Sequence, residues 1–308
     1  MLVVDGVTQV YRGGVVALNN ISFEIKPGLF GLLGPNGAGK STLMRTISTL
    51  QAPSRGSIRF GDIDVIREPE KLREVLGYLP QDFGVYPRVS AYAMLDHMAV
   101  LKGIADATER RETVETLLKQ TNLWAVRNKA IAGFSGGMRQ RYGIAQALIG
   151  QPQLLIVDEP TAGLDPEERN RFLNLLADVS QSVVVILSTH IVDDVAQLCS
   201  DMAIISKGSI VRHGAPNALI AELKGKVWRA FISKGELDQA KATHNVILSR
   251  LVGGRTLIHV LADSNPGDGF EPVSPDLEDV YFVALNSAQK HGGARCSEGL
   301  RASSSATS

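Results

Sequence analysis

Alternating hydrophobic and polar positions near the N-terminus predict two short strands. Leu2–Val10 and Asn20–Ile25 are rich in β-branched residues, and the turn-like sequence YRGG lies between them. A third strand is expected soon afterwards, because Phe30, Leu32 and Leu33 suit a buried parallel strand. The chain therefore begins with β structure.

The next segments change from strands to helices. Residues 57–65, SIRFGDIDV, predict a hairpin that turns at Gly61–Asp62, and VLGYLPQ predicts a strand that ends at Gln81. From Val89 to Gln120, apolar residues recur at helical spacing among good helix formers. We therefore expect a helical subdomain over about residues 84–150.

Two later strands are expected to end in polar residues. LLIV, residues 154–157, is a continuous apolar run that Asp158 and Glu159 follow. SVVVILSTH repeats the pattern, and His190 is its last residue. Ligands of open α/β sheets bind at the carboxyl ends of the strands, so these side chains are expected at one sheet edge.

Two helices in this half have good N-caps. Ser135 precedes GGMRQRYGIAQALIG, and Asp165 precedes Pro166 and a helix from Glu167. MAIISKGSIVRHG then predicts a hairpin about Lys207–Gly208 that closes the first domain. That domain is expected to span residues 1–218.

A smaller α/β appendage is expected over residues 219–285. VWRAFI, VILSRL and TLIHVL are candidate strands around the helix-like GELDQAKA, and a terminal helix is expected near Pro275. Residues 286–308 are rich in Ser, Gly and Ala without an apolar period, which predicts a disordered tail.

Composition excludes several classes of partner and site. The chain has 308 residues, with 32 Lys plus Arg and 32 Asp plus Glu, so no net basic field favours nucleic acid. Cys199 and Cys296 lack a metal-ligand spacing or a disulfide framework. No apolar run approaches the roughly 18 to 20 residues that span a bilayer, so we expect a soluble chain.

The strongest motif lies between the third strand and the helical run STLMRTISTL. Gly34 to Ser41 fits G-x-x-x-x-G-K-[ST], in which glycines let backbone amides wrap a phosphate. Lys40 can reach the β- and γ-phosphates, and Ser41 can offer its hydroxyl to Mg²⁺. The nucleotide-binding residues predicted here are Gly34, Pro35, Asn36, Gly37, Ala38, Gly39, Lys40, Ser41 and Thr42.

The two carboxylates at the end of LLIVDE suggest separate roles. Asp158 is expected to hold Mg²⁺, and Glu159 to orient or deprotonate an attacking water. The alternative, an Asp-Glu pair that caps the next element, is the weaker interpretation.

Three other positions stay open on local physics alone. Tyr11 either stacks on an adenine or closes a sheet edge. Ser135 with the amides of Gly136 and Gly137 is either an ordinary helix cap or a second anion site. A lone histidine such as His190 is more often structural, although its place at a strand end favours a catalytic role.

Together these motifs resemble an ATP-binding cassette (ABC) ATPase, the nucleotide-binding subunit of an ABC transporter. In order, Tyr11, GPNGAGKST, the glutamine of LPQ, FSGGMRQR, LLIVDEP, GLDP and STH are similar to the A-loop, Walker A, Q-loop, signature, Walker B, D-loop and H-loop. The resemblance covers residues 3–214. Phe134 departs from the usual leucine of the signature but remains apolar.

The resemblance implies a fold and roles for the open positions. The fold is a mixed α/β core of the P-loop type with an antiparallel β subdomain, a helical subdomain and a C-terminal appendage. Tyr11 would stack on adenine, Gln81 would bind the metal and couple the attacking water to a permease, and His190 would contact the γ-phosphate. Catalysis would then rest on Glu159, His190, Lys40 and Gln81, and Mg²⁺ on Ser41, Gln81 and Asp158.

The resemblance also implies a dimer. Ser135 and Gly137 would contact ATP held by a second cassette, and Asp165 would lie at the interface. The expected partners are a second, identical cassette and an integral membrane permease, at the cytoplasmic face of the cell membrane. The LEDVYF end resembles cassettes of two-component exporters, which favours export.

A competing hypothesis is a soluble cassette ATPase that acts on ribosomes or DNA. Translation-type members usually carry two cassettes, and this chain has one. Repair-type members insert a long coiled coil before the signature, and Gly56 to Gly133 leaves no room for it. An inert regulatory cassette is disfavoured by the intact Lys40, Asp158, Glu159 and His190.

Overall fold

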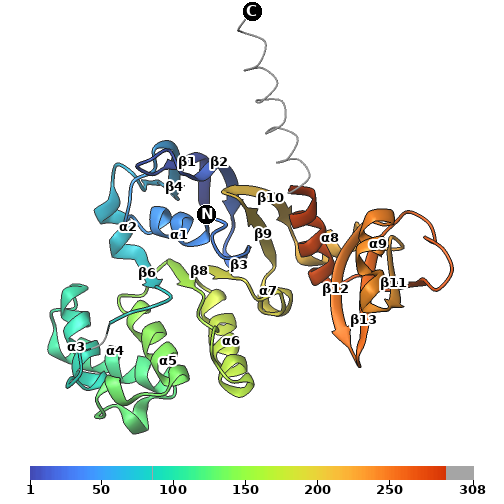
Figure 1. Cartoon of the computed structure of the whole chain (residues 1–308). Coiled ribbons are helices and arrows are strands. Elements are labelled where there is room, and N and C mark those ends of the chain that lie inside the picture. The colour runs from blue at the N-terminus through green and yellow to red at the C-terminus, as the bar shows by residue number, and fades with distance from the viewer. Residues whose placement is uncertain (85, 289–308) are drawn as a thin grey trace, which may run out of the picture. The chain divides into compact units, whose positions relative to one another are not determined.

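The computed structural model describes residues 1–84 and 86–288. It divides into two compact units, Met1–Ile210 and a second unit from Val211 onward. The sequence had predicted the junction after residue 218. The fold class is confirmed: the first unit joins a mainly parallel sheet to an antiparallel sheet and a group of helices (Figure 1).

The antiparallel sheet has the strand order β2-β1-β4-β5. Its strands are β1 (Leu2–Val10), β2 (Val16–Ile25), β4 (Arg55–Phe60) and β5 (Ile63–Asp64). The predicted hairpin at Gly61–Asp62 is confirmed, since Phe60 pairs with Ile63 across it. β2 begins at Val16, earlier than predicted.

The second sheet has the order β10-β9-β3-β8-β7-β6. The strands are β3 (Gly28–Leu33), β6 (Leu76–Leu79), β7 (Leu154–Asp158), β8 (Val184–Thr189), β9 (Asp201–Ser206) and β10 (Ser209–Gly214). β3 pairs in parallel with both β8 and β9, and β7 with both β6 and β8. The ends of β3, β6, β7 and β8 therefore meet at one edge.

Helix α1 (Lys40–Ile47) contributes its apolar face to the core shared by the two sheets. Leu43, Met44 and Ile47 are fully buried, and the rings of Phe23 and Phe30 stack 5.6 Å apart in the same core. The burial of this face fixes the axis of α1, so its first turn is held at the end of β3.

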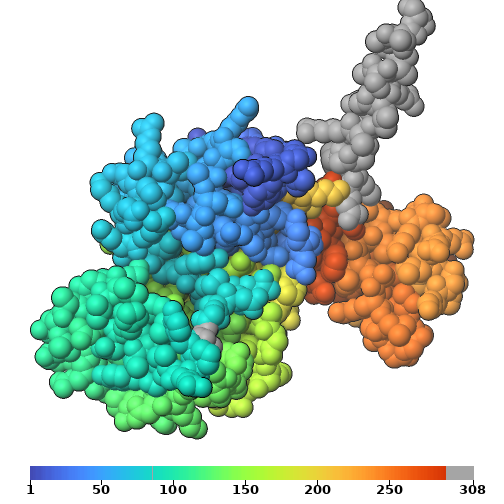
Figure 2. Space-filling model, turned by 60° about the vertical axis from the view of Figure 1, so that its left-hand side comes forward, coloured from blue at the N-terminus to red at the C-terminus, as the bar shows by residue number. Residues whose placement is uncertain are grey.

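The helices of residues 84–150 have a separate hydrophobic core. They are α3 (Ala91–Leu101), α4 (Ala107–Gln120) and α5 (Gly136–Ala147), and this lobe is green to teal in Figure 2. α5 approaches β6 so closely that a Cβ on Gly77 would lie 2.2 Å from the carbonyl oxygen of Ala147. This close approach ties the helical lobe to the sheet.

The first unit also contains one long helix and two short ones. α6 (Pro166–Ser180) follows the predicted cap Asp165, whereas α2 (Pro69–Val75) and α7 (Val192–Leu198) were not predicted. α7 begins just after His190 and packs against β3 and β8.

The second unit is a four-stranded sheet with helices. The order is β12-β13-β11-β14, from β11 (Val227–Ile232), β12 (Val246–Val252), β13 (Arg255–Leu261) and β14 (Glu271–Pro272). Helices α8 (Pro216–Ala221) and α9 (Leu237–Thr243) precede and follow β11, and residues 277–288 are helical.

The terminal helix of this unit is held to the sheet by polar contacts as well as by packing. Buried His259 on β13 lies 2.7 Å from Asp279, measured from Nδ1 to Oδ1, and Leu277 and Val280 are buried beside it. Residues 286–288 of the predicted tail are helical, and the rest of that tail lies outside the described residues. Over residues 1–84 and 86–288, no helix is long and apolar enough to cross a membrane.

Candidate active site

The loop between β3 and α1 has a backbone that needs glycine. Gly37 and Gly39 have φ angles of 78° and 112°, in the left-handed region that side chains disfavour. A Cβ on Gly34 would lie 2.5 Å from the carbonyl oxygen of Ile205. The chain can therefore wrap closely around an anion at the first turn of α1, where backbone N–H groups have no intrahelical acceptor.

Lys40 is buried beneath this loop. Its Nζ donates to the carbonyl oxygens of Gly34 at 2.6 Å and Pro35 at 3.3 Å. It also lies 3.1 Å from Glu159 Oε1, an ion-pair distance without hydrogen-bond geometry. The ammonium group is thus fixed between the loop and the end of β7.

Glu159 has a strained backbone, with φ of 50°. Its N–H donates to the carbonyl oxygen of Ser188 on β8 at 2.8 Å, which holds the residue in place. Its second carboxylate oxygen, Oε2, lies 2.6 Å from Nδ1 of His190. One buried carboxylate therefore connects Lys40 to His190 across three strand ends.

Asp158 is the last residue of β7 and is buried. Burial raises the pKa of its carboxyl group, while hydrogen bonds with Ser188 and Ser41 act in the opposite direction. Its Oδ1 has no hydrogen-bond partner among the described residues. A buried, unpaired carboxylate oxygen beside a serine hydroxyl fits Mg²⁺, which prefers hard oxygen ligands.

The loop, Lys40, Glu159 and His190 contribute to the lining of a cavity of about 420 Å³, whereas Asp158 is not part of that lining. It is lined by Ala17, Pro35, Asn36, Gly37, Gly39, Lys40, Ser41, Thr42, Gln81, Glu159 and His190. Nearly all were expected from the sequence, and Gln81 reaches the cavity from the end of β6. Ala17 was missed, because a small apolar residue in β2 carries no chemical signal.

Tyr11 lies beside this cavity but is not part of its lining. Its hydroxyl donates to Gln51 Oε1 at 3.1 Å and lies 3.5 Å from Thr42 Oγ1. The residue is 40% exposed. Stacking on adenine stays a prediction.

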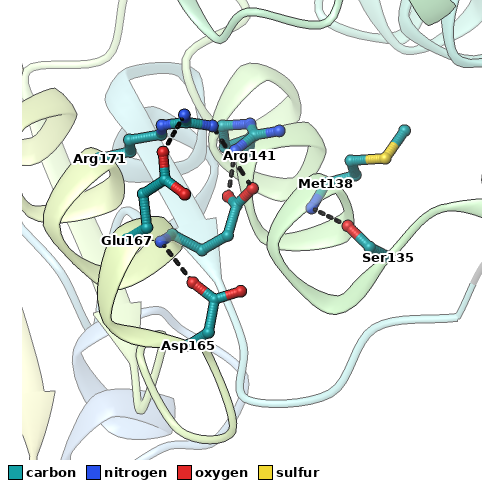
Figure 3. Close-up of polar contacts among 7 residues, drawn as sticks. Ser135, Met138, Arg141, Asp165, Glu167 and Arg171 are labelled. Carbon is teal, nitrogen blue, oxygen red and sulfur yellow. Dashed lines mark hydrogen bonds and ion pairs between the residues drawn. The ribbon is translucent and has the colours of Figure 1, made fainter.

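The residues of FSGG lie apart from the cavity. Ser135 caps α5, where its Oγ accepts from Met138 N at 3.2 Å, and Asp165 caps α6, where its Oδ1 accepts from Glu168 N at 2.8 Å (Figure 3). Ser135 and Gly136 are exposed. The structure therefore does not bring this helix N-terminus to the phosphate loop of the same chain.

Comparison with known proteins identifies the family. Residues 18–162 match the sequence profile described as "ABC transporter". The linearmycin resistance ATP-binding protein LnrL of Bacillus subtilis is 34% identical over 227 residues, which are 73% of this chain and 72% of that protein. The chain belongs to the ABC transporter ATP-binding proteins. As a member of this family, it binds ATP and is an ATPase that acts in transport.

Other ABC relatives and a solved structure agree. The doxorubicin resistance ATP-binding protein DrrA of Mycobacterium tuberculosis is 35% identical, over 71% of this chain and 66% of that protein. The methionine import ATP-binding protein MetN of Bordetella pertussis is 33% identical, over 87% and 75%. The ATP-binding cassette MJ0796, solved as a dimer bound to ADP and Pi, has 27% identity and a TM-score of 0.64, over 70% and 98%.

The metal assignment of this ABC ATPase can be tested with Asp158→Asn. We expect ATP alone to bind nearly as before, because Lys40 and the loop are intact. Adding Mg²⁺ to the ATP-loaded variant should no longer raise its thermal midpoint, and hydrolysis should fall by about 100-fold or more. Differential scanning calorimetry with ATP, with and without Mg²⁺, measures the effect.

The matched control is Asp263→Asn, which neutralises an exposed carboxylate in a loop of the second unit. It should retain the full Mg²⁺ response. A Mg²⁺-dependent rise in Asp158→Asn equal to that of the wild type would contradict the assignment.

Proposed function

We propose that this chain powers a membrane permease by ATP-driven closure of a homodimer. Two copies enclose two Mg²⁺-bound ATP molecules, each held by the phosphate loop of one copy and covered by Ser135 and Gly137 of the other. Hydrolysis then releases the copies. The observation that carries the proposal is the separation within one chain of the phosphate loop from the N-terminus of α5, where Ser135 and Gly136 are exposed and the first backbone N–H groups have no intrahelical acceptor.

On the phosphate side, the loop amides and Lys40 bind the β- and γ-phosphates. Lys40 exchanges its contact with Glu159 for the γ-phosphate, which leaves Glu159 able to accept a proton from the attacking water. His190, already hydrogen-bonded to Glu159, presents its other ring nitrogen to the γ-phosphate. The water oxygen bonds to the γ-phosphorus while the bond from that phosphorus to the β–γ bridging oxygen breaks, so the bridging oxygen leaves with ADP and the γ-phosphate leaves as inorganic phosphate.

Mg²⁺, held by Ser41, Asp158 and Gln81, would neutralise charge on the phosphates. Tyr11, which is 40% exposed beside the cavity, would stack on the adenine. These residues lie on four separate segments, which the two sheets bring to one edge.

On the covering side, Ser135 retains a hydroxyl proton to donate while its oxygen caps α5. The N–H groups of Gly136 and Gly137 occupy the first helical positions, where intrahelical acceptors do not exist. A γ-phosphate from a second copy meets both requirements. Asp165, at the start of α6, lies at the same interface.

An apolar groove in the first unit suits the permease. It encloses about 330 Å³ between α1, β6 and α3, and exposes 57% of Leu50 and 68% of Leu101. Tyr78 of β6 also lines it, and Gln81 of the nucleotide cavity follows two residues after the end of this strand. A partner in this groove therefore contacts the strand that leads to Gln81, at the cytoplasmic face of the cell membrane.

Export is the direction that we favour. LnrL and DrrA are named for resistance to linearmycin and doxorubicin, which supports removal of a toxic cargo from the cell. Import is the second candidate, because the match with the import protein MetN covers more of this chain.

Glu159→Gln tests the homodimer. An amide cannot accept the proton of the attacking water, so hydrolysis should fall by about 10²- to 10⁴-fold while ATP still binds. The variant should elute from a sizing column as a dimer in ATP and Mg²⁺ and as a monomer without nucleotide. Lys40→Ala is the control that should stay monomeric, and a monomeric Glu159→Gln at saturating ATP would refute closure of a homodimer.

The double substitution Leu50→Ser with Leu101→Ser tests the groove. Both side chains are exposed, so folding and the ATP-driven dimer should persist, whereas co-purification with the permease should be lost. Leu251→Ser, at a residue 72% exposed in the second unit, is the matched control. Retained co-purification would exclude the groove.

The double variant Leu50→Ser, Leu101→Ser also reports the direction of transport in cells that make the permease. Cargo should accumulate inside these cells if the complex exports it. A fall in internal cargo would instead favour import.

A further inference from the structure

Glu168 joins the two helix N-termini that face the second copy in the proposed dimer. It lies in the first turn of α6, and its N–H donates to the capping carboxylate of Asp165. Its side chain reaches α5, where its Oε2 forms an ion pair and hydrogen bond with Nη1 of Arg141. One residue thus contacts the segment of Asp165 through its backbone and the helix of Ser135 through its side chain.

Gly137 packs directly against this side chain. A Cβ at Gly137 would lie 2.4 Å from Oε2 of Glu168 and 2.6 Å from its Cδ. The carboxylate is not free to swing away, because Arg141 holds it. The missing side chain at Gly137 therefore has a packing role within the chain as well as its role toward a phosphate.

The charges around Glu168 keep its carboxylate in one place. The Arg141 side chain is 9% exposed and that of Glu168 is 20% exposed, so little water competes for the pair. On the other side, Arg171 Nη1 lies 3.8 Å from Glu168 Oε1, while Arg171 also pairs with exposed Glu167. Glu168 is thus bracketed by two arginines from different helices.

We propose that Glu168 is a positioning residue for the ATP of the partner copy. It sets Ser135 and Gly137 at a fixed distance from Asp165, so the covering face is assembled before the copies meet. This inference rests on the proposed homodimer. It goes further in assigning Glu168 and Arg141, which do not line the nucleotide cavity, to the site on the opposite chain.

A substitution at Glu168 is expected to damage the nucleotide site of the opposite chain and not the phosphate loop of its own chain. Glu168→Ala should leave ATP binding to the isolated chain unchanged, because its own phosphate loop is intact. Hydrolysis by its homodimer should fall by about 10- to 100-fold, since small displacements of reacting groups have effects of that size. Glu167→Ala removes an exposed carboxylate whose ion pair, among the described residues, is with Arg171, and it serves as the matched control with normal activity.

Mixing variants reveals on which chain Glu168 acts. Lys40→Ala lacks a working phosphate loop but keeps an intact covering face. Mixed one to one with Glu168→Ala, it should raise hydrolysis well above that of either variant alone, since the mixed dimer holds one intact site, made of the Glu168→Ala phosphate loop and the Lys40→Ala covering face. Arg141→Leu mixed with Glu168→Ala should restore nothing, because both variants damage the covering face.

A reference pair separates failure of this inference from failure of the homodimer. Lys40→Ala mixed with Ser135→Arg should restore activity if composite sites exist. If that pair restores activity but Lys40→Ala with Glu168→Ala does not, the role of Glu168 is overturned and the homodimer is retained. No restoration by either pair would overturn the proposed dimer itself.

A conservative variant covers the case in which Glu168→Ala does not fold. Glu168→Gln keeps the shape and an oxygen that can accept from Arg141, so it should lose less activity and restore activity with Lys40→Ala in the same way. If ATP hydrolysis falls equally in Glu168→Gln homodimers and in the mixture of Glu168→Gln with Lys40→Ala, the proposal is contradicted.

Discussion

The buried ammonium group of Lys40 is the interaction on which the site depends. Lysine side chains are seldom as deeply buried as Lys40, which is only 5% exposed. Burial of an ammonium group costs free energy unless carbonyl or carboxylate oxygens compensate its charge. Here the loop supplies two carbonyl oxygens and β7 supplies Glu159. Each partner must be placed within a few ångströms, which requires the parallel pairing of β3, β8 and β7. The register of the parallel sheet therefore determines whether the oxygens that hold the Lys40 ammonium group lie within reach of it.

Helix α6 connects both halves of the proposed composite site. Its Glu168 contacts α5, and the neighbouring Arg169 pairs with fully buried Asp194 of α7 at 2.7 Å. Asp194 also accepts from Thr161, two residues after Glu159, at 2.6 Å. Helix α6 thus links the segment around Glu159 and the helix after His190 to the covering face.

The sequence predicted the elements whose signals are local. Apolar runs revealed β7 and β8, glycines revealed the phosphate loop, and Ser135 and Asp165 were recognised as caps. The short helices α2 and α7 were missed, because seven residues give too little periodicity.

Contacts made by tertiary packing were also beyond the sequence. The strained Glu159 and the reach of Glu168 to Arg141 depend on how β7, α5 and α6 pack.

Steady-state ATP hydrolysis measured against protein concentration tests the central claim most directly. The range should span concentrations at which sedimentation shows the nucleotide-free chain to be monomeric. If each site needs residues from two copies, the rate should rise faster than linearly at low concentration and become proportional once dimers predominate. A rate strictly proportional to concentration throughout would mean that one chain hydrolyses ATP alone, and would contradict the composite site.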